Sequence, residues 1–307
     1  YNFWQDDEHV RGILRRTTLE NYTLEEIQWE TVLDVDALAN LENANWVYKG
    51  RRCLSSDPGR CLLSLSDGGK DAVVIREYDL DNQVFVDGGF ELDEAKTRLA
   101  WVDANTLLVG TDFGAGSLTT SGYPRTIRLW RRGIAINEAE QLFEIGAEDV
   151  SAGAFTVSLA DRDYSFVDRS PDFFTEETLL LTDEGLLAKL PLPIDANFQG
   201  VLGQSAIVLL RSDWSSGVGE TFSAGSLIAM NLVDSARTGV ATDVATILAP
   251  TSSAEVDAIS GVAITSESIY ISALKDVAGV ILRARIGNDG WELSRVSLPE
   301  NGAIQVV

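Results

Sequence analysis

Short apolar runs that recur at a nearly constant spacing limit most strongly what this chain can fold into. Runs near Trp46, Trp101, Phe155, Ile207 and Val262 follow one another at intervals of about 50–55 residues. Within each interval lie further short runs, rich in β-branched and aromatic residues and separated by Gly, Asp, Asn and Ser. This pattern predicts an all-β fold, a β-propeller of four-stranded antiparallel blades. A sandwich has fewer strands and no single period, and a parallel β-helix repeats over a shorter one.

Residues 99–130 show the pattern of one blade most clearly. Apolar runs occupy residues 99–102, 106–109 and 126–130, and Asp103-Ala104-Asn105 predicts a hairpin turn between the first two. Residues 112–125 are rich in Gly, Ser and Thr and too long for a tight turn, so they predict a surface loop. Within this loop, Gly114-Ala115-Gly116-Ser117 lacks the Lys-Ser/Thr of a phosphate-binding loop and no helix is expected after it. We interpret it as a flexible loop on the propeller rim.

The other strands are expected in six sets, with one helical turn at residues 34–41. We also expect Trp46 and Trp101 to be buried between blades, where aromatic side chains pack well. The expected strands are residues 1–4, 10–18, 29–35, 46–50, 61–65, 72–78, 83–86, 139–143, 154–159, 163–167, 178–181, 186–190, 197–200, 205–210, 226–231, 244–248, 258–264, 268–273, 280–286, 291–297 and 303–307.

The first and last sets of strands are incomplete. Residues 1–35 offer three strands, and residues 303–307 offer one. Unpaired strand edges lose hydrogen bonds, so we expect flanking segments of a longer parent protein to complete these blades. In this chain alone, either the last strand pairs beside the first and closes a ring of six blades, or a gap remains. We favour the gap, because closure would bend every packed blade interface.

Composition and charge exclude several classes of protein. The 307 residues are 45% hydrophobic, which is enough for a large core and argues against disorder. The net charge of −23 repels nucleic acid and anionic lipid, and no apolar run reaches the length of a membrane span. We interpret the acidic surface as one that keeps the protein soluble; the alternative is that it steers a cationic ligand or pairs with a basic partner. The chain has no signal peptide and opens on Tyr1 rather than Met, so we expect a fragment of a longer protein.

The two cysteines lie close together in the sequence. Cys53 and Cys61 flank Asp57-Pro58-Gly59, which predicts a turn, so the thiols can face each other across a hairpin. A disulfide and two buried, reduced thiols both remain open. The compartment is therefore periplasmic or cytoplasmic, and a disulfide would favour the periplasm.

Candidate catalytic and metal-binding residues are scarce. His9 is the single histidine and no Gly-x-Ser-x-Gly motif occurs, so a Ser-His-Asp site would lack a well-placed imidazole. Asp6-Asp7-Glu8-His9 offers metal-ligand types, but adjacent turn residues rarely converge on one ion, so we interpret it as a solvated hairpin tip. Asp161 and Asp163 resemble a glycosidase pair, yet chance produces such pairs among 47 acidic residues. We expect no catalytic, cofactor-binding or metal-binding residue in this chain.

Three segments carry a resemblance to a known family. They read Asp7-Glu8-x-Val10-Arg11-Gly12-Ile13-x-Arg15-Arg16-Thr17, Asn45-Trp46-Val47-Tyr48-Lys49-Gly50, and Gly110-Thr111-Asp112-Phe113-Gly114-x-Gly116-Ser117-Leu118-Thr119-x-Ser121-Gly122-Tyr123-Pro124-Arg125. These segments resemble bacterial serine peptidases of the prolyl oligopeptidase family. The similarity extends over essentially the whole chain, and the last segment is long enough to be specific.

The resemblance implies a seven-bladed propeller that covers an α/β-hydrolase domain carrying Ser, Asp and His. Residues 1–307 would be one propeller domain with about six blades, without the hydrolase domain, so no catalytic residue of the family maps onto this chain. The implied role is a gate that admits short proline-containing peptides through the central tunnel. Lys96, Arg98 and Asp149 lie near the starts of expected inner strands and are candidates to line that tunnel. The alternative is an independent propeller that binds a peptide or protein without catalysis.

Overall fold

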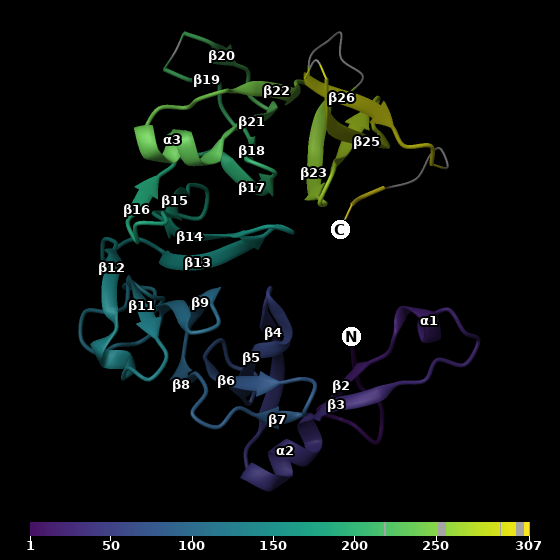
Figure 1. The fold of residues 1–307 in the computed structure, drawn as a ribbon, viewed down its shortest axis with the longest axis vertical. Coiled ribbons are helices and arrows are strands. Elements are labelled where there is room, and N and C mark those ends of the chain that lie inside the picture. The colour runs from purple at the N-terminus through teal and green to yellow at the C-terminus, as the bar shows by residue number, and fades with distance from the viewer. Residues whose placement is uncertain (218, 251–255, 289, 299–303, 307) are drawn as a thin grey trace. The chain divides into compact units, whose positions relative to one another are not determined.

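The computed structural model describes residues 1–217, 219–250, 256–288, 290–298 and 304–306. They form two compact units, the first comprising Tyr1–Ala147 with Ala152–Phe155 and the second Glu148–Ser151 with Thr156–Val307. Antiparallel sheets dominate both units, so the all-β class and the four-stranded blade predicted from the sequence are confirmed (Figure 1).

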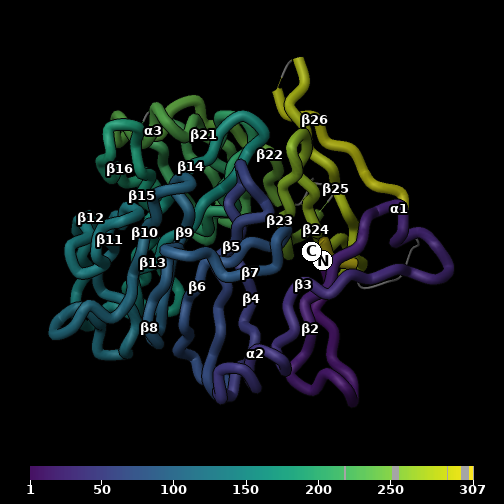
Figure 2. Tube along the Cα trace, turned by 60° about the horizontal axis from the view of Figure 1, so that its bottom comes forward, coloured from purple at the N-terminus to yellow at the C-terminus, as the bar shows by residue number. Residues whose placement is uncertain are grey.

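The first unit contains three antiparallel sheets, drawn from purple to teal in Figure 1. Their strand orders are β1-β2-β3, β4-β5-β6-β7 with β8 also paired to β6, and β12-β11-β10-β9. Helix α2 contacts β2 and β4 at the end of the second sheet (Figure 2). The elements are β1 (Asn2–Trp4), β2 (Ile13–Arg16), α1 (Leu19–Tyr22), β3 (Glu30–Asp34), α2 (Val35–Glu42), β4 (Trp46–Leu54), β5 (Asp57–Asp67), β6 (Val73–Asp79), β7 (Val84–Phe85), β8 (Glu91–Ala95), β9 (Arg98–Asp103), β10 (Thr106–Gly110), β11 (Thr126–Arg131), η1 (Ile136–Glu138) and β12 (Glu140–Glu144).

Strand β5 is apolar on both faces because a sheet packs against each of them. Side chains of a strand alternate between its faces. Cys61, Leu63 and Leu65 join a core cluster with Leu14 and Val32 of the first sheet. The intervening Leu62 joins a second cluster with residues of the third sheet, which are Leu99, Trp101, Leu107, Val109 and Trp130. Alternate residues of β5 therefore pack against the neighbouring sheets on its two sides.

The second unit continues the same architecture. Its sheets have the orders β13-β14-β15-β16, β17-β18-β21-β22, β19-β20 and β23-β24-β25-β26, and the boundary between the units falls within β13. A core cluster with Ile207 and Leu227 on one side and Ile271 and Leu282 on the other joins the β17–β22 sheet to the β23–β26 sheet. The elements are β13 (Ser151–Ser158), β14 (Asp163–Ser170), β15 (Glu177–Leu181), β16 (Leu187–Lys189), β17 (Asn197–Leu202), β18 (Ser205–Leu209), β19 (Trp214–Ser215), β20 (Thr221–Phe222), β21 (Leu227–Asn231), α3 (Leu232–Thr238), β22 (Ala245–Leu248), β23 (Ala258–Ile264), β24 (Ile269–Lys275), β25 (Ala278–Gly287) and β26 (Gly290–Arg295).

Glycines accompany a break in register in the first strand of three sheets. The pairing shifts between Tyr48 and Gly50 in β4, between Phe198 and Gly200 in β17, and between Ile259 and Gly261 in β23. Gly200 has a φ of +137°, a conformation that side chains other than hydrogen rarely adopt. These β-bulges bend the first strands and re-aim their side chains.

The predicted position of one turn is wrong, although the cysteine pairing stands. Asp57, Pro58 and Gly59 begin β5, and the turn lies at Ser55-Ser56. Cys53 and Cys61 are still cross-strand partners and are joined by a disulfide, with 3.9 Å between their Cα atoms. A bulge after Cys53 absorbs the extra residues, which explains why the shorter turn leaves the pair intact.

Several other expectations needed correction. Trp101 is buried, but Trp46 is only half-buried, and its indole nitrogen donates to Glu42 on the neighbouring helix. The sequence reading missed β8, β19, β20, α1 and α3. Helix α3 has a recognisable start, since Asn231 accepts a hydrogen bond from the backbone of Asp234, and it ends at Gly239 in the left-handed region.

Two remaining expectations concern the end of the chain and the membrane. Of the strand expected at residues 303–307, both end residues lie outside the described residues, and Ile304–Val306 between them form no strand. The Val306 backbone N–H donates to Ser272 Oγ at 2.8 Å. Among the described residues, no helix combines the length and apolar character that crossing a bilayer requires.

Candidate functional site

The acidic run around His9 is a hairpin tip, as the sequence predicted. One carboxylate oxygen of Asp6 accepts the backbone N–H groups of Glu8 and His9 and lies 3.0 Å from His9 Nδ1. A hydrogen bond from the Trp4 indole, followed by that from the His9 backbone, lowers the pKa of Asp6 to about 2. Within the described part of the chain, no three His, Cys, Asp or Glu residues are grouped so as to hold a metal ion. These contacts make Asp6 the residue that closes the turn.

The glycine-rich loop after β10 is folded on itself. Ser117 is buried, and its hydroxyl contacts the Gly114 carbonyl at 2.7 Å and the Phe113 backbone N–H at 2.8 Å. Arg125 donates to the carbonyls of Gly116 and Ile145 and pairs with a carboxylate oxygen of Glu144 at 2.6 Å. The loop was expected to be flexible, but this bonding ties it to the outer strand of its own sheet. Strand β11, and not a helix, follows the loop directly.

Asp149, which its place in the sequence made a candidate to line the tunnel, is held in an ion pair within the protein. It is buried, and Arg169 binds both of its carboxylate oxygens at 2.9 and 3.0 Å. Arg169 also contacts Glu177, which in turn holds Lys189 at 2.6 Å. These bonds raise the pKa of Arg169, with Asp149 as the first cause, and lower the pKa of Glu177, with Lys189 as the first cause. Asp149 therefore belongs to a structural ion network.

Lys96 and Arg98 lie together at the start of the first strand of their sheet. The Lys96 ammonium lies 4.1 Å from the centre of the Tyr123 ring, and the Arg98 guanidinium lies 5.3 Å from it. Tyr123 belongs to the long loop after β10 and is held by a backbone hydrogen bond to Thr119. An aromatic face attracts cations without neutralising them, so this site keeps its positive charge.

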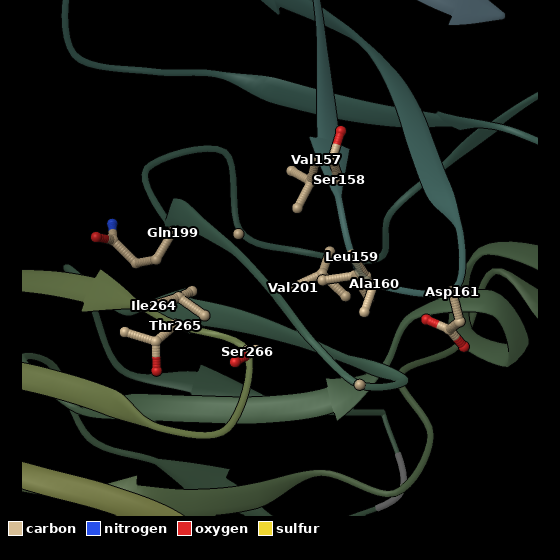
Figure 3. Close-up of a pocket in the computed structure, with 12 residues that line it drawn as sticks. Val157, Ser158, Leu159, Ala160, Asp161, Gln199, Val201, Ile264, Thr265 and Ser266 are labelled. Carbon is tan, nitrogen blue, oxygen red and sulfur yellow. The ribbon is translucent and has the colours of Figure 1, made fainter. Parts of the chain in front are cut away.

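A pocket of about 430 Å³ opens in the second unit where three first strands end (Figure 3). In Figure 3, Gln199 lies at one end of the pocket and Asp161 at the other, with Leu159, Ala160 and Val201 between them. Its lining residues come from the ends of β13, β17 and β23 and the turns that follow these strands. They are Val157, Ser158, Leu159, Ala160, Asp161, Gln199, Gly200, Val201, Gly203, Ile264, Thr265 and Ser266.

The pocket combines an apolar floor with a few polar groups, which suits a small ligand or a short peptide segment. Its shape depends on Gly200, because a Cβ atom there would meet Ile264 Cδ1 at 3.1 Å. Asp161 was considered above as half of a glycosidase pair; it lies at the pocket, whereas Asp163 begins β14. The sequence reading missed the pocket, although glycine in the predicted strand at residues 197–200 is a signal of a bulge.

Comparison with known proteins gives one consistent family. The model of the prolyl oligopeptidase N-terminal β-propeller domain matches residues 1–307. An uncharacterized peptidase, y4nA of Sinorhizobium fredii, is 36% identical over 310 residues, which is 99% of this chain and 42% of that protein. An uncharacterized peptidase, RP174 of Rickettsia prowazekii, is 30% identical over 99% of this chain and 44% of its own length.

Solved structures show the same relationship. A post-proline cleaving enzyme from Rickettsia typhi superposes with a TM-score of 0.87 at 30% identity, over 97% of this chain and 45% of that one. Oligopeptidase B from Trypanosoma brucei, at 15% identity and a TM-score of 0.64, shares the fold. This chain thus spans less than half the length of the relatives that it matches.

Proposed function

We propose, from the premise that this chain belongs to the prolyl oligopeptidase family as its N-terminal β-propeller domain, that residues 1–307 form one propeller that gates a serine endopeptidase. Its substrates are short proline-containing peptides, and its partner is an α/β-hydrolase domain of the same parent chain. The observation that carries the proposal is the likeness over 97% of this chain to a post-proline cleaving enzyme more than twice as long.

The physical basis of the gate is the geometry of a propeller. A ring of blades leaves an axial channel that is lined by the first strand of each blade. Such a channel admits an extended peptide and excludes a folded protein. In the second unit, the first strands β13, β17 and β23 end at the pocket of Figure 3, which offers an entering peptide an apolar floor and polar ends.

The chemistry of this chain supports a non-catalytic role. A serine nucleophile needs a neighbouring histidine that takes its proton. The single histidine, His9, faces Asp6 in an exposed turn, where the carboxylate holds two backbone N–H groups as well. His9 is thus engaged in closing its own turn, and the catalytic groups belong to the hydrolase domain of the parent.

The proposal is tested with the complete natural polypeptide that carries this chain. One substrate is a short, internally quenched peptide with a single proline. The other is the same sequence inserted into an exposed loop of a folded carrier protein, and an unrelated protease that cuts both confirms that each is accessible. We expect cleavage of the short peptide, its loss after a serine-reactive inhibitor, and a much lower kcat/KM for the inserted sequence.

Two results would contradict the gate. Equal kcat/KM values for the free and inserted sequences would show that the propeller excludes nothing. Binding of the peptide without cleavage would favour the alternative, a propeller that acts as a binding module.

A further inference from the structure

Arg52 and Arg98 lie on the first strands of adjacent sheets in the first unit, and these strands are tied together. Arg52 belongs to β4 and Arg98 to β9. The Trp101 indole N–H of β9 donates to the Arg52 carbonyl at 3.0 Å. Around this bond, Leu54, Leu62, Leu99 and Trp101 pack in one buried cluster. The backbones that carry the two guanidinium groups are therefore held in place.

No carboxylate within the described part of the chain lies within 4 Å of either guanidinium group. Arg98 contacts the Thr97 carbonyl at 3.4 Å, and the Arg52 guanidinium makes no hydrogen bond to any of the described residues. Nearby Lys96 reaches only an exposed oxygen of Asp71 at 3.9 Å. Acidic residues outnumber basic ones by 47 to 24, yet neither arginine has a carboxylate partner among the described residues, so the two carry uncompensated positive charge on an acidic protein.

Arg52 lies at the surface, close enough to Arg98 for their charges to interact. Its side chain is exposed to water, yet burial and then repulsion by Arg98 lower the pKa of its guanidinium. Two neighbouring cations repel each other, and an anion bound between them relieves that repulsion. Arginine donates hydrogen bonds in a planar fork that matches a carboxylate, and such pairs strengthen where water is partly excluded.

We infer that Arg52 and Arg98 form a carboxylate-binding site, which captures a carboxylate of short peptides as they enter the propeller. Tyr123 positions the neighbouring Lys96, whose charge adds to the attraction. This inference rests on the proposed function and makes it more specific, because it names the chemical group of the substrate that the propeller recognises. The group is the C-terminal carboxylate or the carboxylate of an Asp or Glu side chain.

The test compares three internally quenched peptides with the same central sequence around one proline. The first peptide ends in a free C-terminal carboxylate, and the second ends in a C-terminal carboxamide. The third also ends in a carboxamide, and its last residue is Glu. With the complete natural polypeptide, we expect kcat/KM for the first to exceed that for the second by about three- to tenfold at low salt. If kcat/KM for the third peptide matches that for the first, the site binds side-chain carboxylates as well. If it matches that for the second, the site binds only the C-terminal carboxylate.

Substitutions assign the effect to the two arginines. In Arg52→Gln and in Arg98→Gln, the preference for the carboxylate peptide should fall to about onefold. The matched control is Arg131→Gln, an exposed arginine of β11 in the same unit, which should keep the preference. Calorimetric binding of a proline-free acetylated peptide, with and without its terminal carboxylate, gives the same comparison without catalysis. Thermal unfolding of each variant checks that it folds, and Arg98→Lys, which keeps the charge, should retain part of the preference.

The failure of this inference is distinguishable from failure of the proposed function. Equal kcat/KM for the carboxylate and carboxamide peptides, or a preference that survives both arginine substitutions in folded protein, overturns the carboxylate site alone. If the polypeptide neither cleaves nor binds any of the peptides, the proposed function and this inference both fail.

Discussion

Glu77 shows at the scale of a single residue how this fold accommodates a charge in its interior. Its side chain is fully buried in the first unit. Arg132 donates to its two carboxylate oxygens at 2.8 and 3.1 Å, and the Phe90 backbone N–H donates at 2.7 Å. Arg60 lies 3.5 Å away. A buried carboxylate is tolerated only when it is paired and hydrogen-bonded in this way.

We predict that Glu77→Gln destabilises the protein strongly. The amide keeps the shape but removes the charge that Arg132 needs, and breaking one side of a buried pair typically costs about 3–5 kcal/mol. Urea unfolding of wild type and variant measures the difference. The control is Glu140→Gln, whose partner Arg131 lies 3.7 Å away at an exposed position, with an expected loss below about 1 kcal/mol. Equal losses in the two variants would contradict the role given to burial.

A second residue-scale prediction concerns Tyr78 at alkaline pH. Tyr78 is buried and donates to the Val32 carbonyl at 2.8 Å. Burial, and after it the charge of Asp79, raises the pKa of Tyr78 from 10.0 to about 12. The folded state therefore holds this proton more tightly than the unfolded state does. The stabilisation is complete below pH 10 and is lost as the pH rises toward 12, by about 3 kcal/mol at most.

Comparison with Tyr78→Phe isolates this effect from other groups that titrate at the same pH. At pH 8 the variant should be less stable by about 1 kcal/mol, because the Val32 carbonyl loses its donor. Between pH 10 and 12 the free energy of unfolding should fall more steeply for wild type, so that the difference shrinks and then changes sign. Parallel curves of stability against pH would rule out Tyr78 as the cause.

At the scale of the element, β-bulges interrupt the first strands of several sheets. Strand β17 has its register shift at Gly200, and β23 has one at Gly261. Gly200 has a φ of +137° and lies close to Ile264, whereas a Cβ at Gly261 would meet nothing nearer than Ser272 at 3.7 Å. The two positions look alike in the sequence, and only the backbone conformation distinguishes them.

We predict that Gly200→Ala destabilises the chain and that Gly261→Ala does not. A side chain at Gly200 enforces an unfavourable backbone conformation, which typically costs about 1–3 kcal/mol. At Gly261 the conformation is ordinary and the added methyl has room, so stability should change by less than about 1 kcal/mol. Thermal unfolding of both variants checks the pair. Similar melting temperatures would show that the β17 bulge adapts to a side chain.

Packing between sheets gives a second prediction for the elements. Trp101 is buried between the β4–β8 and β9–β12 sheets, where its indole also bonds Arg52. Replacing such a residue with alanine typically costs about 3–5 kcal/mol. The exposed Trp4, stacked on Arg15 at 4.3 Å, is the matched control, with an expected loss of about 1 kcal/mol or less. An unchanged urea midpoint in Trp101→Ala would refute its packing role.

At the scale of the whole molecule, the family of this chain and its share of its relatives' length lead to one prediction about activity. The 307-residue chain alone should not hydrolyse a chromogenic proline peptide, because its single histidine closes an exposed turn with Asp6. Turnover that survives repurification and disappears in His9→Ala would contradict this.

The gapped arrangement of blades also stays a prediction. A ring closed by hydrogen bonds between the first and last strands would overturn it.

The sequence by itself determined most of the strands, most of the turns and the family. Alternating apolar residues and turn residues act over a few positions, so β9, the turn at Ala104 and Asn105, β10 and α2 could be located without tertiary contacts. Cys53 and Cys61 could be placed opposite each other, although the turn between them was misplaced by a bulge. No comparable pattern marked α1, whose four residues include none that is buried.

Only the tertiary structure decided which charged groups are paired and which have no ionic partner among the described residues. Asp149 and Arg98 looked equivalent in the sequence, as charges near the starts of first strands. Packing brought Arg169 onto Asp149 from 20 residues away and Arg132 onto Glu77 from 55 away, while Arg98 was set on the strand next to that of Arg52. The physical reason is that an ion pair depends on distances across sheets and between blades, and no local pattern records those distances.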